Sequence, residues 1–347
     1  MILRPFTVVL IVPTGVGASI GGYAGDALPV ARAIAQVCDT LITHPNVLNG
    51  AQLYWPMANT LYVEGYALDK FASGCWGLQP VHQNRIGLIL DAAIEADLQL
   101  RHLQVVDGAR ATLGLNICDY VVTDKALGVE LRIANSGASW GTIANLDSLL
   151  RAAEVLIKKA GVNAIAVVAR FPDDTDSPQL QQYRKGKGVD PLAGAEAVIS
   201  HLIVKTFKIP CAHAPALAPL PLDPQISPRS AAEEIGYTFL PCVLAGLSKA
   251  PQFVTDGRFT QSQIMSDRVD AVIVPATACG GSAILSLSQN PAVQIIAVAE
   301  NQTKMQVSPE KLGIKAIPVN SYLEAIGVLV AYQAGVNPGI LSSIEGC

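Results

Sequence analysis

The sequence predicts an α/β protein with a predominantly parallel, Rossmann-like, doubly wound sheet and helices on both faces. This architecture could be divided into two similar lobes. Hydrophobic residues make up 50% of the 347 residues, but aromatic residues only 5% and charged residues 15%. Aliphatic material of this kind is typical of parallel strands covered on both faces. In addition, the chain repeats a strand–turn–helix pattern: a short β-branched run, then a turn marked by glycine or proline, then a helical period.

Strands are expected where apolar runs are bounded by turn residues, at residues 6–13, 40–44, 86–90, 120–123, 130–134, 164–169, 271–274, 294–299 and 315–319. Helices are expected between them, most regularly over residues 92–103, 145–159 and 193–207. The second of these ends in Lys158-Lys159-Ala160-Gly161, as helix carboxyl termini often do. A helix over residues 230–249 should be kinked by Pro241.

The chain is long enough for one large domain or two ordinary ones. Residues 217–228 are rich in proline and are therefore expected to be an extended connector. We accordingly expect an N-terminal lobe over residues 1–216 and a C-terminal lobe over residues 229–347. Residues 171–190 form a polar stretch that is long for a loop in a compact protein, which favours a lid or a binding loop.

Composition also narrows the range of partners. The net charge of −4 and the scattered basic residues give no surface for nucleic acid. Seven cysteines without a C-x-x-C pair indicate free thiols in a reducing compartment. The apolar run at residues 7–12 is too short to span a membrane and is expected to be a strand. We therefore expect a cytoplasmic protein without a membrane or nucleic-acid partner, and a homo-oligomer is an open alternative to a monomer.

Two strand–loop–helix junctions, at residues 9–20 and 271–284, resemble each other: in both, Ile-Val-Pro is followed by threonine, glycine and serine. Glycines after a strand let the backbone approach a ligand, and a helix amino terminus favours an anion. Neither loop matches a nucleotide-binding motif, and tight turns without a ligand are the alternative. The residues expected to bind a small anionic metabolite are Thr14, Gly15, Gly17, Ser19, Thr277, Gly280, Gly281 and Ser282.

Cys279 and His213 are the candidate catalytic residues. A thiol at a helix amino terminus has a lowered pKa, which suits a nucleophile or, with a partner thiol such as Cys75 or Cys118, an acid/base. His213 lies at the end of a predicted strand, where a general base can face a ligand. The alternatives are a small buried cysteine and a structural histidine.

An acidic cluster follows the predicted strand at residues 164–169. The carboxylates of Asp173, Asp174 and Asp176 could hold Mg²⁺, the one cofactor that the sequence suggests. Arg184 and Lys185 could hold a phosphate nearby. A solvated loop of mixed charge is the alternative.

Four segments together resemble an uncharacterised cyanobacterial and plastid family known only as a domain of unknown function. They are residues 13–22, Asp190-Pro191 with Ser200-His201-Leu202-Ile203, Cys211-Ala212-His213-Ala214-Pro215, and residues 275–282. The resemblance covers essentially the whole chain and implies a housekeeping protein of photosynthetic organisms, but it brings no reaction or catalytic residues. The Thr-Ala-Cys-Gly segment is also similar to the thiol loops of aspartate/glutamate-type racemases.

The leading hypothesis is an enzyme that acts on a small phosphorylated or carboxylated metabolite bound between the two glycine-rich loops, with its reaction class open. One alternative is a regulatory or assembly protein that binds such an anion without turning it over. A second is a cysteine-dependent racemase-like or isomerase-like enzyme, and a third is a scaffolding role through an apolar surface.

Overall fold

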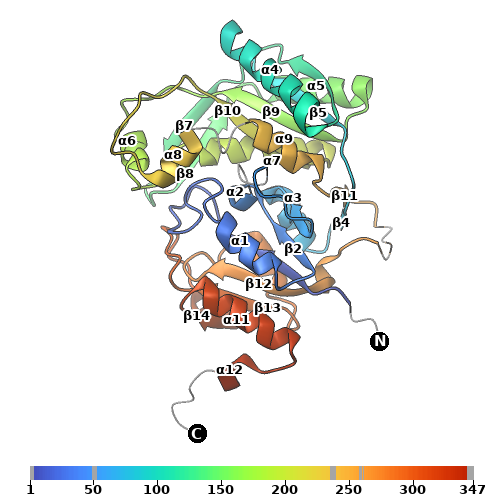
Figure 1. Cartoon of the computed structure of the whole chain (residues 1–347), viewed down its shortest axis with the longest axis vertical. Coiled ribbons are helices and arrows are strands. Elements are labelled where there is room, and N and C mark those ends of the chain that lie inside the picture. The colour runs from blue at the N-terminus through green and yellow to red at the C-terminus, as the bar shows by residue number, and fades with distance from the viewer. Residues whose placement is uncertain (1–3, 49–52, 235–239, 258–259, 261, 342–347) are drawn as a thin grey trace.

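Two parallel sheets organise the chain, one in each of two lobes (Figure 1). The computed structural model describes residues 4–48, 53–234, 240–257, 260 and 262–341. The predicted α/β class with parallel sheets and helices on both faces is confirmed.

The first lobe combines the two ends of the chain. Its six-stranded parallel sheet has the order β14-β13-β12-β1-β2-β3. Because β1 lies directly beside β12, with Leu10 opposite Ile273, the two glycine-rich loops leave neighbouring strands at the same edge. The strands are β1 (Thr7–Leu10), β2 (Thr40–Thr43), β3 (Thr60–Tyr62), β12 (Val269–Pro275), β13 (Gln294–Val298) and β14 (Ala316–Val319).

The second lobe is formed by the middle of the chain. Its four-stranded parallel sheet has the order β10-β9-β5-β6, with bounds β5 (Ile86–Leu90), β6 (Ile117–Val122), β9 (Ala164–Arg170) and β10 (Cys211–Ala216). The sheets therefore group the strands differently from the lobes expected at residues 1–216 and 229–347. The expected connector, residues 217–228, leads from β10 to α8 (Pro228–Ala232) within the second lobe.

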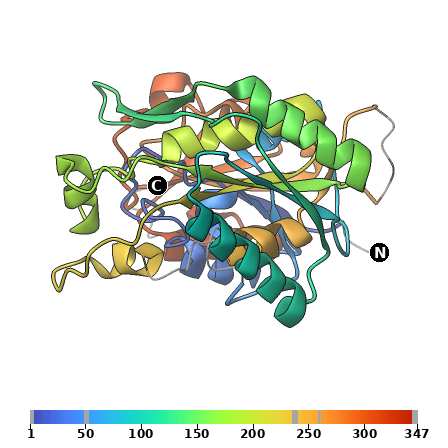
Figure 2. The same ribbon diagram turned by 90° about the horizontal axis from the view of Figure 1, so that it is seen from above.

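Helices cover both faces of both sheets, as Figure 2 shows for the second lobe. On one side lie α1 (Leu28–Ala35), α4 (Ala96–Leu113), α9 (Leu240–Ser248) and α11 (Tyr322–Gln333). On the other lie α3 (Gly65–Ala72), α5 (Leu146–Val155), α7 (Ala193–Phe207) and α10 (Ser282–Leu287). Each side forms a hydrophobic cluster that continues from one lobe into the other. The strand side chains alternate between the two clusters, as Leu88 and Ile89 do.

The chain crosses between the lobes twice, and the two crossings lie side by side. The outgoing strand β4 (Gly77–Gln79) pairs antiparallel with the returning strand β11 (Gln252–Val254). Leu78 in this ribbon is fully buried.

An antiparallel hairpin packs against α7 within the second lobe. Its strands are β7 (Val129–Ile133) and β8 (Ser139–Ile143). Gly194 and Gly141 let helix and hairpin approach closely, because a Cβ on either residue would overlap with the facing backbone or with Ala195. The position of α7, which carries much of the site described below, therefore depends on this contact.

Several expected elements match the structure closely. The helix predicted over residues 193–207 is α7, and the one over residues 145–159 is α5 with a π-helical extension over Leu156–Ala160 that ends at the left-handed Gly161. Pro241 lies in the first turn of α9, and residues 235–239 are outside the part of the chain that the structure describes. The remaining short helices are α2 (Pro45–Leu48), α6 (Pro178–Arg184) and α12 (Pro338–Leu341).

Candidate functional site

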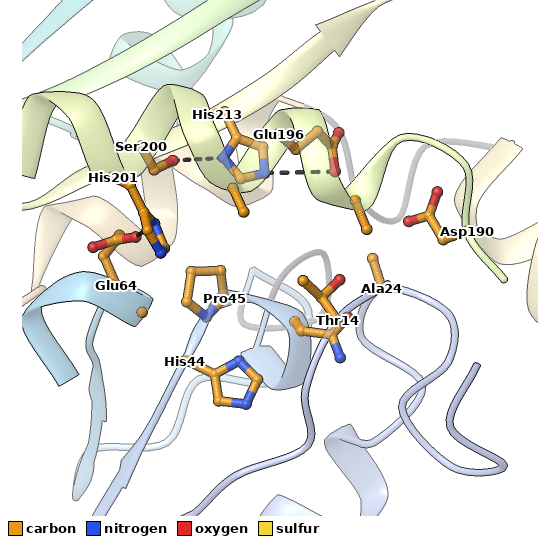
Figure 3. Close-up of a pocket in the computed structure, with 14 residues that line it drawn as sticks. Thr14, Ala24, His44, Pro45, Glu64, Asp190, Glu196, Ser200, His201 and His213 are labelled. Atoms are coloured by element: carbon orange, nitrogen blue, oxygen red, sulfur yellow. Dashed lines mark hydrogen bonds and ion pairs between the residues drawn. The ribbon is translucent and has the colours of Figure 1, made fainter. Parts of the chain in front are cut away.

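A pocket of about 90 Å³ lies between the two lobes (Figure 3). The first lobe contributes residues that follow its strands at their carboxyl ends, where ligands of parallel sheets generally bind. They are Thr14, Ala24, His44, Pro45, Asn46, Glu64 and Gly65. The second lobe contributes α7, the segment before it and β10, through Asp190, Ala193, Glu196, Ala197, Ser200, His201 and His213.

Glu196 and Ser200 lie one helical turn apart on α7, so both side chains are on the same face of the helix. His213 comes from β10, against which α7 packs. Its Nδ1 is 2.5 Å from the Ser200 hydroxyl, and its Nε2 is 3.5 Å from a carboxylate oxygen of Glu196. His213 and Glu196 are 11% and 16% exposed, which leaves both within reach of a small molecule in the pocket.

His44 lies opposite this group, on the side of the first lobe (Figure 3). It directly follows β2, and its Nε2 accepts a hydrogen bond of 2.9 Å from the backbone N–H of Val12. Burial lowers the pKa of His44 to about 4. The imidazole is therefore neutral at physiological pH.

Glu64 and His201 form an ion pair between the lobes. Glu64 is the N-cap of α3 and accepts hydrogen bonds from the backbone N–H groups of Tyr66 (2.8 Å) and Ala67 (3.3 Å). Burial lowers the pKa of His201, but the hydrogen bond and charge of Glu64 outweigh it, so that the pKa is raised overall.

Asp190 lies at the entrance of α7 and has a pKa close to neutrality. Burial, followed by the negative charge of Glu196, raises it to about 7, although the backbone of Leu192 donates a hydrogen bond to the carboxyl. The carboxyl of Glu233 lies further along the interface and accepts a 2.8 Å hydrogen bond from the Tyr183 hydroxyl. Burial and the charge of Asp190 raise the pKa of Glu233 well above its usual range.

The first glycine-rich loop is held by backbone contacts from both lobes. The N–H of Ser139, in the hairpin, donates to the carbonyl of Gly15 (3.0 Å), and the N–H of Ser19 donates to the carbonyl of Gln302 (2.9 Å). Gly15 and Gly17 have φ values of 68° and 64°, as the turn requires. Of the four residues expected to bind an anion in this loop, Thr14 lines the pocket.

The second glycine-rich loop, residues 277–282, does not contribute to the pocket lining among the described residues. Its backbone is engaged by a neighbouring segment, since Val307 donates to Thr277 (2.8 Å) and accepts from Cys279 (2.9 Å). The amino terminus of α10 faces Asp69 of α3, which hydrogen-bonds to the N–H of Ala283. A carboxylate of the protein itself thus lies where an anion was expected.

Cys279 is fully buried, and its environment acts against the expected reactive thiolate. Burial, with a smaller effect of Glu310, raises its pKa to about 11. The burial outweighs the helix amino terminus on which the sequence prediction rested. Of the two candidate catalytic residues, the structure places only His213 in the pocket.

Of the acidic cluster and its two basic neighbours, Asp173 and Arg184 are engaged with other protein groups. Asp173 pairs with Arg170 and accepts a 2.9 Å hydrogen bond from the backbone of Ala218. Arg184 is buried and pairs with Glu234 at 2.8 Å, whereas Lys185 is exposed. Asp174 and Asp176 are exposed. Across the described ranges, no group of three or more histidine, cysteine or carboxylate side chains is arranged to hold a metal. Mg²⁺ at this cluster stays a prediction of the sequence.

Glu64 and Glu196 are site residues that sequence reasoning did not single out. Each is a lone carboxylate without a recognisable spacing, so no local pattern distinguishes it from a solvent-exposed acid. Asp190, Ser200 and His201 did appear in the segments that carried the family resemblance. For these three residues the resemblance was the one signal in the sequence that pointed to this wall of the pocket.

Residues 7–342 match the family described as "Protein of unknown function (DUF3326)". The chain belongs to this family. It is also similar to an uncharacterized lipoprotein of the cyanobacterium Synechococcus sp., with 61% identity over 342 residues, which cover 99% of this chain and 95% of that relative. The resemblance inferred from the sequence is therefore confirmed. No solved structure matches the chain.

The name of this relative corrects the expected cytoplasmic location, because a lipoprotein is attached to a membrane through its lipid. Among the residues described here, no helix is both long enough and apolar enough to cross a membrane.

Proposed function

We propose that this protein is an enzyme that transfers protons on a small polar metabolite bound between the two lobes, with His213 as its general acid and base. The observation that carries the proposal is the contact between His213 Nδ1 and the Ser200 hydroxyl, at 2.5 Å on the wall of the pocket.

A serine hydroxyl can both donate and accept a hydrogen bond. When Nδ1 of His213 carries the proton, it donates to Ser200 and Nε2 is free to act as a base. When Nε2 takes up a proton, the imidazolium that forms still donates from Nδ1 to Ser200, and its Nε2–H can return the proton as an acid. His213 can therefore gain and lose a proton at Nε2 without losing this hydrogen bond.

Glu196 supports the charged form of the same imidazole. Its carboxylate oxygen lies 3.5 Å from Nε2, close enough to stabilise the imidazolium that forms when His213 takes up a proton. Asp190, with a pKa of about 7, provides a second group on the same side that can exchange a proton near neutral pH.

The size of the pocket restricts the metabolite. A volume of about 90 Å³ is well below the roughly 300–1,000 Å³ that is typical of pockets for drug-sized ligands. A molecule of only a few heavy atoms fits this space. That the metabolite is an anion, as the glycine-rich loops suggested, stays a prediction. Of the residues expected to bind that anion, Thr14 lines the pocket.

Deuterium uptake tests this proposal even while the substrate is unidentified. The protein is incubated in D₂O with small metabolites extracted from a cyanobacterium, and incorporation is measured by mass spectrometry. We expect at least one metabolite to be labelled, and His213→Gln to slow labelling by about 100-fold or more. His102→Gln is the matched control, because His102 lies on α4, outside the pocket, with its Nδ1 2.8 Å from the Leu98 carbonyl oxygen.

Equal labelling by wild-type protein and His213→Gln would remove His213 from the reaction. A metabolite that raises the melting temperature of the protein but takes up no deuterium would instead support a binding protein without turnover.

A further inference from the structure

We infer that the pocket is built for an uncharged carbonyl compound, whose oxygen accepts a hydrogen bond from the Nδ1–H of His44. The inference deepens the proposed function, because it assigns a substrate class to the same pocket. It rests on three observations: the tautomer of His44, the accessibility of its second nitrogen, and the charges that line the pocket.

The tautomer of His44 is fixed by the backbone. The N–H of Val12 lies 2.9 Å from Nε2 of His44. A backbone N–H can only donate, so Nε2 must be the unprotonated acceptor. In a neutral imidazole the proton is then on Nδ1, which is therefore a hydrogen-bond donor.

This donor is directed into a site without a protein partner. His44 is only 8% exposed, yet it lines the pocket. Within the part of the chain that the structure describes, Nδ1 of His44 has no hydrogen-bond acceptor, and it is not sealed from the pocket. An unpaired donor that opens into a pocket from a side chain more than nine-tenths buried is placed to meet an acceptor atom of a ligand.

The charges around the pocket decide which acceptor is suitable. Its described lining contains the carboxyl groups of Glu64, Asp190 and Glu196 but no lysine or arginine. Glu64 is already paired with His201. A carboxylate or phosphate would face the negative charge of Glu196, and the described lining offers no lysine or arginine to bind it. An aldehyde, ketone or amide oxygen satisfies the His44 donor without bringing a second negative charge.

This placement suits proton transfer at the carbon beside the carbonyl. His213 Nε2 takes the proton, the C–H electron pair forms the C=C bond of an enolate, and the carbonyl electrons move to oxygen. The Nδ1–H of His44 stabilises the oxygen where negative charge develops. Return of the proton from the imidazolium to carbon completes the exchange, and no further reactant is consumed.

Three probes of similar size test the inference by nuclear magnetic resonance on protein labelled with ¹⁵N-histidine at neutral pH. They are acetamide, which carries an uncharged carbonyl, acetate, which is an anion, and ethylammonium, which is a cation. We expect His44 to show the Nδ1–H tautomer and acetamide to shift its Nδ1 signal. Acetate should bind at least about ten-fold more weakly, and ethylammonium should leave the Nδ1 signal unchanged.

A proton on Nε2, an Nδ1 signal that acetamide does not move, or tighter binding of acetate than of acetamide would each overturn the inference. His44→Leu should weaken acetamide binding by about ten-fold, because the donor is lost. His44→Gln should largely restore it, since glutamine keeps both an oxygen for the Val12 N–H and an N–H donor. If His44→Leu does not fold, the spectra of the wild-type protein decide alone.

These outcomes are independent of the test of the proposed function. Loss of deuterium exchange in His213→Gln would stand even if acetate bound more tightly than acetamide, and only the substrate class would then be wrong. Conversely, a His44 donor that responds to acetamide would stand if His213 proved to have no part in proton exchange.

Discussion

His201 on α7 pairs with Glu64 at the start of α3, so that one ion pair joins the two lobes beside the pocket. Glu64 caps α3 and at the same time faces the helix that carries Glu196 and Ser200. The charge of His201 therefore contributes to the contact between the two pocket walls.

The raised pKa of His201 predicts a pH-dependent contribution to stability. A histidine whose pKa is higher in the folded state stabilises the fold fully below the unfolded pKa of about 6.5. This contribution is lost as the pH rises through the folded value. His201→Gln should therefore lower the melting temperature more at pH 5.5 than at pH 9. The exposed His82 provides the control His82→Gln, for which no such difference is expected. An equal effect of His201→Gln at both pH values would contradict the ion pair.

For Asp190, removal of the ionisable group is expected to raise stability, and to do so mainly at high pH. Its folded pKa of about 7 lies above the unfolded value near 3.9, so its ionisation at higher pH costs stability. Asp190→Asn keeps an oxygen for the Leu192 N–H but cannot ionise. The variant should melt at a higher temperature than the wild type at pH 8.5, and the difference should shrink towards pH 4.5. A variant that is less stable than the wild type at pH 8.5 would show that the ionised carboxyl is compensated in the fold.

The close contact of Gly194 with the β7–β8 hairpin leads us to expect that this hairpin positions α7. The Cβ of Gly194→Ala would overlap with the backbone of Trp140, so the helix and hairpin would have to separate. We expect a loss of about 1–3 kcal/mol in the free energy of unfolding and reduced proton exchange. Gly108→Ala on α4 is the matched control, because a Cβ there has no neighbour within 4 Å. It should stabilise the protein by about 0.5–1 kcal/mol. Similar denaturation curves for both variants would argue against the hairpin contact.

Cys279 should be protected from alkylation. Its thiol is buried and has a pKa of about 11, whereas Cys75 is exposed. Brief treatment with iodoacetamide at neutral pH, followed by peptide mapping, should modify Cys75 and leave Cys279 intact. Treatment of the denatured protein should modify both. Modification of Cys279 in the native protein at a rate similar to Cys75 would restore the thiol as a catalytic candidate.

The sequence was most informative where a pattern is local. The leucines and alanines of α5 and the unbroken apolar run of β9 are such patterns, and both elements form as expected. The pairing of β1 with β12 is different, because its partners lie more than 250 residues apart and no local pattern marks one strand as the neighbour of the other. The division into lobes depends on that pairing, and so it could not be derived from a proline-rich segment.

In the site, too, features with a local signal could be predicted, whereas features that depend on distant parts of the chain could not. His213 could be proposed because a histidine at a strand end has a general chemical meaning, and the structure places it in the pocket. Asp69 illustrates the limit: it faces the amino terminus of α10 across more than 200 residues, and it lies where an anion was expected. The burial of Cys279 likewise depends on packing that the glycines around it do not reveal.

A crystal structure with the metabolite that takes up deuterium would test the central claim most directly. We predict that the metabolite lies between the lobes, with its reacting carbon in reach of His213 Nε2 and its carbonyl oxygen within about 3.2 Å of His44 Nδ1. The same metabolite bound at residues 277–282, with the pocket between His44 and His213 empty, would contradict the account.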